Sequence, residues 1–331
     1  MSPLSDVCSR PVAEPTIVVT RPVPDKALDM LRARARVIVG PGEPPLPTAD
    51  EVRDLVRDAD IIYTLPANPL TGDAIRGAAK VRMIATMGTG YDNIDLAAAR
   101  ERNIPITYAP GILDETTADG IFALMLAAAR RLGEAERFLR AGKYRGWTPF
   151  LFLGVDVYEA TLGIVGMGRI GRAMARRAMG FRMKILYTDA ARNEAAEKEF
   201  GATFVSLDDL LAKSDFVTLH VPLLPETRHL IDGKRLAQMK KTAILINGSR
   251  GPVVDERALA EALRDGVIGG AGIDVFEREP KVEPLLLERE NAVLVPHIAS
   301  ASERTRVRMA VRAAENILAF LDGKPLLDPV P

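Results

Sequence analysis

The sequence predicts an α/β fold with two similar domains, each built on a doubly wound parallel sheet. Short runs rich in β-branched residues alternate along the chain with segments of helical periodicity. This alternation is typical of parallel strands covered by helices on both faces. It occurs twice, because a first series of five such runs is followed by a long apolar segment and a second series of six.

The first series lies between residues 16 and 110. Its expected strands are TIVVT (16–20), RVIVG (36–40), IIYTL (61–65), RMIAT (82–86) and ITYAP (106–110). A helix is expected over 24–35, and Thr48 and Glu51 have the spacing of a capping box at the start of another.

A long helix is expected over DETTADGIFALMLAAARRL (114–132). It is apolar on most sides, so we expect it to be buried between domains or at a subunit interface. The second series follows, with expected strands TLGIVG (161–166), KILYT (184–188), FVTLH (216–220), AILIN (243–247), GGAGID (269–274) and AVLVPH (292–297). A last helix is expected from about Ser302 to Leu321.

The two series also resemble each other in sequence. Residues 58–75 are similar to 214–231, and residues 82–99 are similar to 243–260. This similarity supports two related domains rather than one large one, and 331 residues are enough for both.

Composition excludes several classes of function. Lys plus Arg and Asp plus Glu number 44 each, so the net charge of zero favours neither nucleic acid nor a membrane surface as a partner. The single cysteine, Cys8, cannot form an internal disulfide or a cysteine-based zinc cluster, and no metal site is expected. Residues 1–14 read as a frayed polar tail without the apolar run of a signal peptide, so a cytoplasmic protein is expected.

The segment LGIVGMGRIG (162–171) contains the pattern G-x-G-x-x-G directly after an expected strand and at the start of an amphipathic helix. In this pattern Gly166 would permit a tight turn, Gly168 would let a pyrophosphate approach the backbone, and Gly171 would let helix and strand pack closely. The free N–H groups of the helix N-terminus would bind the phosphates. The sequence therefore predicts a dinucleotide site.

Asp189 ends the next expected strand, 18 residues after Gly171. An acid there binds the ribose hydroxyls of adenosine and repels a 2′-phosphate, which favours NAD over NADP. Arg192 lies close enough in sequence to keep NADP as an alternative.

A reaction that transfers hydride to a carbonyl needs an acid, and histidine is the usual one near neutral pH. The chain has three histidines: His220 and His297 end expected strands, and His229 lies in the loop or helix start that follows His220. Arg250, in NGSRG, is a candidate for binding a carboxylate. Either Glu277 or Glu279 could orient a histidine, and the residues alone leave this choice open.

A second glycine turn, GTGYDNID (88–95), follows a strand of the first series. The backbone amides of Thr89 and Gly90 are candidates for binding a carboxylate there.

These motifs together resemble the D-isomer-specific 2-hydroxyacid dehydrogenase family. The resemblance extends from residue 16 to the end of the chain and is strongest in GTGYDNID, LGIVGMGRIG, HVPLLPETRHLI, INGSRGPVVDE, AGIDVFEREP and VPHIASAS. The segment GWTPFLFLGVDVYEATLGIVGMGRIG is most similar to the glyoxylate/hydroxypyruvate reductase branch.

The resemblance implies a role for each candidate at the reacting centre. His297 is implied as the acid/base, Glu279 as its partner, and Arg250 as the group that binds the carboxylate and polarises the carbonyl. Glu277 is implied to be a bystander. The substrate carboxylate is implied to bind the amides of Thr89 and Gly90.

The cofactor-binding residues are implied in the same way. The pyrophosphate would contact Arg169 and Ile170, the ribose Asp189, and the carboxamide end of the nicotinamide Asp274. The remaining residues implied to line the cofactor groove are Val221, Pro222, Ser249, Arg250 and His297.

Two positions depart from the pattern of the reductase branch. Thr188-Asp189 stands where NADP-preferring members often have Ser-Arg, which supports NAD. Trp147 is present, but Leu151 stands where the branch often has a second aromatic residue that reaches a neighbouring subunit.

The resemblance also implies the domain order. A Rossmann-type dinucleotide-binding domain (110–297) would be inserted into a flavodoxin-like substrate domain (12–109 and 298–331), with the active site in the cleft between them. The helix at 114–132 would contribute to a homodimer.

The expected function is the NAD(P)H-dependent reduction of a small 2-oxo acid such as glyoxylate or hydroxypyruvate. Two alternatives remain at this level. One is another D-2-hydroxyacid dehydrogenase, of the D-lactate, D-3-phosphoglycerate or phosphite type. The other is an NADH-sensing corepressor-like protein without turnover.

Overall fold

The computed structural model describes residues 14–42 and 44–331, so Cys8 and all but the last residue of the expected tail lie outside the described residues. The chain divides into two compact units. Unit 1 comprises Met1–Ile112 and Glu303–Pro331, and unit 2 comprises Leu113–Ser302. The sequence analysis expected the dinucleotide-binding domain over residues 110–297. Unit 2 begins three residues later and ends five residues later than that range. In the described part of the chain, no helix combines the length and hydrophobicity of a transmembrane span.

Unit 1 contains a five-stranded parallel sheet in the order β2-β1-β3-β4-β5. Its strands are β1 (Thr16–Val19), β2 (Arg36–Val39), β3 (Ile61–Thr64), β4 (Met83–Thr86) and β5 (Ile106–Thr107). This is the flavodoxin-like strand order. The expectation of a flavodoxin-like sheet for this part of the chain is confirmed.

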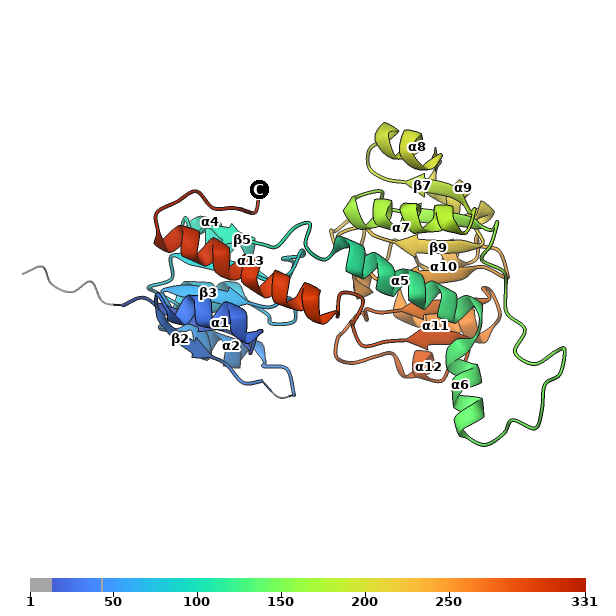
Figure 1. The fold of residues 1–331 in the computed structure, drawn as a ribbon, viewed down its shortest axis with the longest axis horizontal. Helices are drawn as coiled ribbons and strands as arrows, with labels where there is room; N and C mark the ends of the chain where they lie inside the picture. The colour runs from blue at the N-terminus through green and yellow to red at the C-terminus, as the bar shows by residue number, and fades with distance from the viewer. Residues whose placement is uncertain (1–13, 43) are drawn as a thin grey trace, which may run out of the picture. The chain divides into compact units, whose positions relative to one another are not determined.

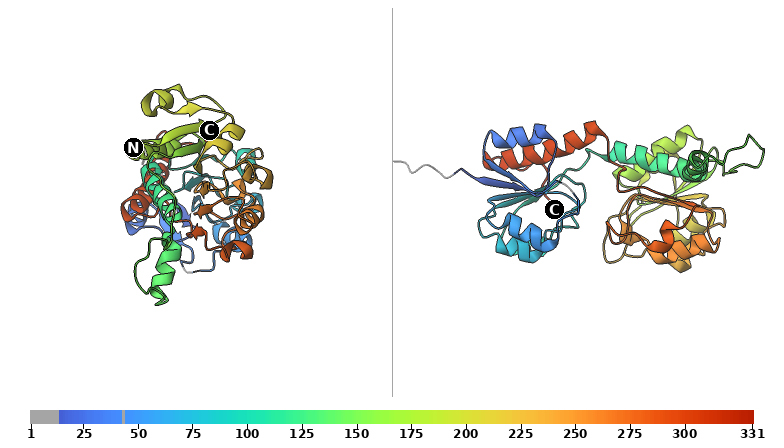
Figure 2. Two further views of the ribbon diagram at one scale, coloured as in Figure 1. Left: turned by 90° about the vertical axis from the view of Figure 1, so that its right-hand side faces the viewer. Right: turned by 90° about the horizontal axis from the view of Figure 1, so that it is seen from below.

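Helices cover both faces of this sheet (Figures 1 and 2). On one face lie α1 (Asp25–Arg32) and α13 (Glu303–Leu321), and on the other lie α2 (Ala49–Val56), α3 (Gly72–Gly77) and α4 (Leu96–Glu101). The expected capping box starts α2, because Thr48 Oγ1 accepts from the Glu51 N–H while Glu51 accepts from the Thr48 N–H at 2.8 Å. The central strands are buried on both sides, as a parallel sheet requires.

The expected strand over 106–110 is wrong beyond Thr107. After Thr107, the last residue that pairs with β4, the chain contacts the C-terminal segment. Thr107 forms an antiparallel bridge with Pro329, and the Tyr108 N–H donates to the Asp328 carbonyl at 3.2 Å.

Unit 2 contains a seven-stranded parallel sheet in the order β12-β11-β10-β9-β6-β7-β8. Its strands are β6 (Thr161–Val165), β7 (Lys184–Thr188), β8 (Thr203–Phe204), β9 (Phe216–Leu219), β10 (Ile244–Asn247), β11 (Gly270–Ile273) and β12 (Ala292–Leu294). The strand order reverses direction between β6 and β9, as in a Rossmann-type sheet, which confirms that expectation. Two-residue β8 was not expected, and β12 ends three residues before the expected bound at 297.

Two layers of helices cover this sheet (Figure 2). One layer contains α5 (Asp114–Ala129), α7 (Arg169–Gly180) and α8 (Glu194–Phe200). The other contains α9 (Leu207–Lys213), α10 (Gly233–Leu236), the 3₁₀ turn η1 (Gly251–Val253), α11 (Glu256–Arg264) and α12 (Pro284–Leu287).

The expected helix over 114–132 is too long. It ends at Ala129 because Arg131 adopts a left-handed backbone with φ of 52°, and a separate helix, α6 (Leu132–Arg140), follows. Most apolar residues of α5 pack inside unit 2, where Ile121 and Met125 are fully buried in the core shared with α7 and the sheet. Packing within the unit therefore accounts for the hydrophobicity of α5.

Candidate active site

The glycine loop joins β6 to α7 at the point where the strand order of unit 2 reverses. Gly166 has φ of 96°, and a Cβ there would lie 2.8 Å from the carbonyl carbon of His220. A Cβ on Gly171 would lie 2.1 Å from the Gly166 carbonyl oxygen. Both glycines are therefore required by the fold of the loop itself.

Gly168 is different. It is the N-cap residue of α7, its φ of −73° suits any residue, and a Cβ there would have no atom within 4 Å. The space in front of Gly168 is thus open, at the N-terminus of a 12-residue helix. Such a cradle fits a pyrophosphate, which needs close approach to backbone N–H groups. Arg169 and Ile170 are the next two residues, in the first turn of α7.

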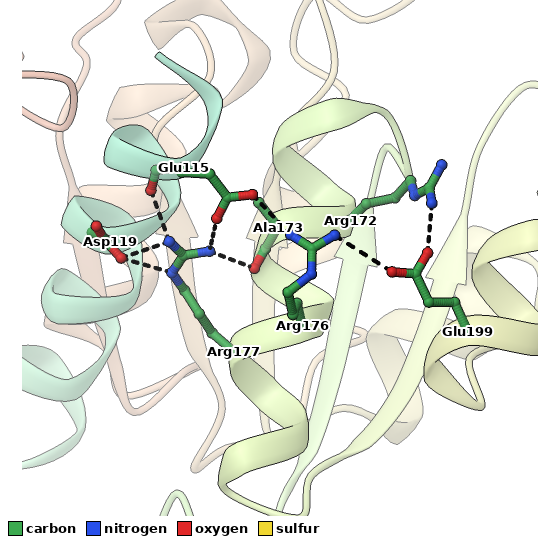
Figure 3. Close-up of polar contacts among 7 residues, drawn as sticks. All are labelled: Glu115, Asp119, Arg172, Ala173, Arg176, Arg177 and Glu199. Carbon is green, nitrogen blue, oxygen red and sulfur yellow. Dashed lines mark hydrogen bonds and ion pairs between the residues drawn. The ribbon is translucent and has the colours of Figure 1, made fainter. Parts of the chain in front are cut away.

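Ion pairs hold α7 between its two neighbouring helices (Figure 3). On the α5 side, Glu115 accepts from Arg176 and Arg177 at 2.8 Å each. On the α8 side, Glu199 lies 2.5 Å from Arg172. These partly exposed ion pairs connect α7 to both neighbouring helices.

Asp189 follows β7 and turns back toward the glycine loop. Its Oδ2 accepts from the Met167 N–H and its Oδ1 from the Ala190 N–H, each at 2.7 Å. Each carboxylate oxygen retains a lone pair for a ribose hydroxyl. The carboxylate is therefore held in place beside the loop that would bind the pyrophosphate.

Arg192 pairs with Glu197. Its guanidinium forms two hydrogen bonds with Glu197, at 2.8 and 2.7 Å. The bonds from Arg192 and from the Tyr187 hydroxyl lower the pKa of Glu197 to about 2. Arg192 thus pairs with a carboxylate of its own, which leaves Asp189 as the acid at the end of β7.

The segment after β9 forms a wall beside the glycine loop. Val221 lies against Gly166, since a Cβ on Gly166 would be 3.1 Å from Val221 Cγ1. Pro222 follows, and its carbonyl accepts from the Thr227 hydroxyl at 2.7 Å. The binding of the cofactor by Val221 and Pro222 stays a prediction.

The turn that carries Arg250 is organised by Asn247, the buried last residue of β10. Asn247 Oδ1 accepts from the N–H and the hydroxyl of Ser249, and its Nδ2 donates to the Arg250 carbonyl at 3.0 Å. The sequence analysis did not single out Asn247. The only feature of the sequence that could have indicated this role is the position of the asparagine between a strand and a turn of small residues.

His297 lies after β12 and pairs with a carboxylate. Its Nδ1 is 3.0 Å from Glu279 Oε2, and Glu279 Oε1 accepts from the Phe276 N–H at the same distance. Burial alone would raise the pKa of Glu279. The hydrogen bond and charge of His297, the Phe276 N–H and the charge of Arg250 outweigh burial and hold that pKa below its usual value. Glu279 is therefore ionised near neutral pH and oriented toward the imidazole.

Asp274 holds the backbone around His297. This residue is 1% exposed, and its carboxylate accepts from the N–H groups of Ile298 and Ala299 at 2.6 and 3.1 Å. Burial raises the pKa of Asp274, and those two N–H groups offset part of the rise. These bonds support the left-handed backbone of His297, whose φ of 54° is unfavourable for a residue with a side chain.

The other two histidines have different surroundings. Burial lowers the pKa of His220 to about 3, and its Nε2 lies 2.9 Å from Thr218 Oγ1. His229 Nε2 pairs with Glu277 Oε1 at 2.9 Å. The geometry thus distinguishes the two glutamates that the residues alone left open, since Glu279 is the one beside His297.

The Thr89–Gly90 turn belongs to unit 1. It is part-exposed after β4, and Thr89 Oγ1 donates to the Ala109 carbonyl at 3.2 Å. The turn packs tightly against Pro66, because a Cβ on Gly88 would lie 2.4 Å from that side chain. Carboxylate binding by the amides of Thr89 and Gly90 stays a prediction.

Comparison with known proteins gives a consistent result. Residues 122–299 match the model of the NAD-binding domain of D-isomer specific 2-hydroxyacid dehydrogenases. A glyoxylate reductase of Korarchaeum cryptofilum is 50% identical over 313 residues, covering 94% of each chain.

Two solved structures are similar over almost their whole length. A glyoxylate reductase from Paecilomyes thermophila has a TM-score of 0.84 at 33% identity, with 96% of this chain and 99% of that chain covered. An NADPH-dependent glyoxylate/hydroxypyruvate reductase from Sinorhizobium meliloti, in complex with NADP and malonate, has a TM-score of 0.85 at 32% identity, with 96% and 97% covered. The resemblance seen in the sequence is confirmed, and unit 2 carries a site for a nicotinamide dinucleotide. The chain is a member of the D-isomer specific 2-hydroxyacid dehydrogenase family.

Proposed function

We propose that this protein reduces a small 2-oxo acid, glyoxylate or hydroxypyruvate, to the 2-hydroxy acid, with His297 as the proton donor. The observation that carries the proposal is the 3.0 Å contact between His297 Nδ1 and Glu279 Oε2. Because Glu279 occupies Nδ1, the Nε2 position remains to face a carbonyl oxygen. The names of the relatives, glyoxylate reductases among them, support the substrate class.

Each residue would have a separate task in the reaction. A nicotinamide held at the glycine loop of unit 2 would supply the hydride for the carbonyl carbon. Protonated His297 donates its Nε2 proton to the carbonyl oxygen, so that hydride and proton together convert the carbonyl to a hydroxyl group. The Glu279 carboxylate stabilises the imidazolium before transfer, and the Arg250 guanidinium binds the substrate carboxylate through two parallel hydrogen bonds.

We propose NADH as the preferred cofactor. Asp189 is ready to accept two ribose hydroxyls, and its charge would repel the 2′-phosphate of NADPH. The pairing of Arg192 with Glu197 supports this preference, because Arg192, three residues after Asp189, is already held by a carboxylate.

Steady-state oxidation of NADH and NADPH in the presence of glyoxylate, hydroxypyruvate, pyruvate or phenylpyruvate tests both proposals. Rapid NADH oxidation with the two small acids is expected. A strong preference for NADPH would contradict the role of Asp189 but keep the reaction. Tight NADH binding without turnover of any acid would contradict the reaction and favour a sensor.

The role of His297 is tested by His297→Ala. We expect kcat to fall by at least about 100-fold, the lower range of general acid catalysis. The Kd for NADH should stay within about threefold of the wild-type value, because the glycine loop and Asp189 are untouched. Wild-type turnover in the variant would remove His297 from the proposed role.

We also propose a homodimer formed through a projecting arm, defined as α6 and the loop 141–153. No residue of α6 is buried, and the arm exposes Leu139, Trp147 and Phe150, the last two at 79% and 81%. Exposed apolar side chains gathered in one segment are typical of a protein interface. This proposal places the dimer contact after α5 rather than on α5 itself. Light scattering should give a dimer for the wild type and a monomer for Trp147→Ser combined with Phe150→Ser.

A further inference from the structure

Glu256 is a buried carboxylate in unit 2. It is the first residue of α11 and is only 7% exposed. Acidic side chains are rarely buried to this degree without partners. Its partners are two backbone groups, since Oε2 accepts from the Glu277 N–H at 2.6 Å and Oε1 accepts from the Glu283 N–H at 2.5 Å.

The two N–H groups lie at the two ends of one loop, residues 277–283, and this loop carries Glu279. Residues 278–281 are exposed, so side-chain packing does little to hold them. Hydrogen bonds to an ionised acceptor are shorter and stronger than those between neutral groups. The Glu256 carboxylate thus connects both ends of the loop to α11, and Arg257 of the same helix adds an ion pair with Glu283 at 2.9 Å at one end.

The same loop also rests on the turn that carries Arg250. A Cβ on Gly251, the residue after Arg250, would lie 1.9 Å from the carbonyl group of Phe276. His229 adds a second connection, because its N–H donates to the Pro252 carbonyl at 2.8 Å while its ring pairs with Glu277. A displacement of the loop would therefore move both Glu279 and the turn that carries Arg250.

We propose that Glu256 is a positioning residue for the Glu279–His297 pair. It acts through the loop: by binding the N–H groups of Glu277 and Glu283, it keeps the Glu279 carboxylate within hydrogen-bond distance of His297. The inference rests on the proposed reaction, in which a misplaced Glu279 would no longer orient the proton donor.

The test compares Glu256→Gln with Asp255→Ala. Glutamine keeps the size of the side chain but removes the charge and turns one acceptor into a donor that faces an N–H. Asp255 is the N-cap of the same helix and accepts from the Ala258 N–H at 2.9 Å, so its replacement weakens α11 without touching either loop bond. Loss of this cap should lower the melting temperature by about 2–4 °C.

Two measurements follow. Hydrogen exchange of the wild-type and variant proteins, without ligand, reports the amide hydrogens of Glu277 and Glu283 directly. Their protection should fall by at least about tenfold in Glu256→Gln and stay unchanged in Asp255→Ala. With NADH and glyoxylate, kcat should fall by about 10–100-fold in Glu256→Gln, while the KM for glyoxylate and the Kd for NADH change less than about threefold.

Unchanged kcat and protection in Glu256→Gln would overturn the proposal. Equal losses of kcat in the two variants would also overturn it, because the effect would then come from the stability of α11. Failure of the wild type to reduce any 2-oxo acid would contradict the proposed function instead, and the hydrogen-exchange result would still show whether Glu256 holds the loop.

Discussion

Replacing Gly168 by alanine should separate cofactor binding from folding. A Cβ at this position would have no protein atom within 4 Å, and the backbone φ of −73° is allowed for alanine. The methyl group would instead occupy the open space in front of the α7 N-terminus. If a pyrophosphate approaches the backbone there, the methyl group must displace it.

The expected magnitudes follow from these contacts. Alanine is a poorer N-cap than glycine, so the free energy of unfolding should fall by up to about 1 kcal/mol. A single lost hydrogen bond between a backbone N–H and a charged phosphate is worth about 1.5–3 kcal/mol. The Kd for NADH should therefore rise by about 10–150-fold.

The assay combines NADH titration, followed by fluorescence or calorimetry, with urea unfolding of the same proteins. Gly180→Ala is the matched control. Gly180 ends the same helix, and a Cβ there would also have no atom within 4 Å. That variant should bind NADH normally and gain up to about 1 kcal/mol of stability. A Kd for Gly168→Ala within threefold of the wild type would refute the assignment of this space to the pyrophosphate.

Two further predictions concern stability. Glu115→Gln should lower the free energy of unfolding by about 0.5–1 kcal/mol at low salt, because Arg176 and Arg177 lose a shared partner that is 61% exposed (Figure 3). The difference should disappear in 1 M NaCl, and an equal loss at both salt concentrations would contradict an ionic origin. The second prediction follows from the pKa of His220, which burial lowers to about 3 from its usual value of 6.5. Between these pH values the unfolded chain binds a proton that the folded protein does not. The His220 contribution is therefore complete above pH 6.5 and lost as the pH falls toward 3, by up to about 1.4 kcal/mol per pH unit. Urea unfolding should show a shallower pH dependence for His220→Asn, and parallel curves for variant and wild type would contradict the burial argument.

The features that the sequence predicted correctly depend on short-range patterns. Alternating strands and helices indicated two parallel sheets, and Thr48 with Glu51 indicated the start of α2. The three glycines between 166 and 171 indicated the turn after β6, because their spacing reflects steric demands inside one loop. In each case the residues that determine the structure lie within a few positions of one another.

The errors came from a contact between distant residues, from a strand too short to show a pattern and from a local backbone conformation that the residue type does not indicate. Strand β5 is short because Thr107 pairs with Pro329, more than 200 positions away. Strand β8 has two residues, too few to show a period. The end of α5 depends on the left-handed backbone of Arg131. Arginine seldom adopts this conformation, so the residue type does not predict it.

The candidate site shows the same division. The sequence by itself determined the chemical types present at the ends of the strands: a glycine loop, Asp189, Arg250 and a histidine after the last strand. The residues alone left open which glutamate faces His297, because Glu277 and Glu279 are two positions apart in one loop and have the same chemistry. The family resemblance implied Glu279, and the tertiary structure has Glu279 beside His297. Only the tertiary structure decided that Asn247 and Glu256 hold the turns that carry Arg250 and Glu279. Most of those bonds join a side chain to a backbone N–H or carbonyl group, which almost every residue has, so the sequence does not show which backbone groups the side chain will meet.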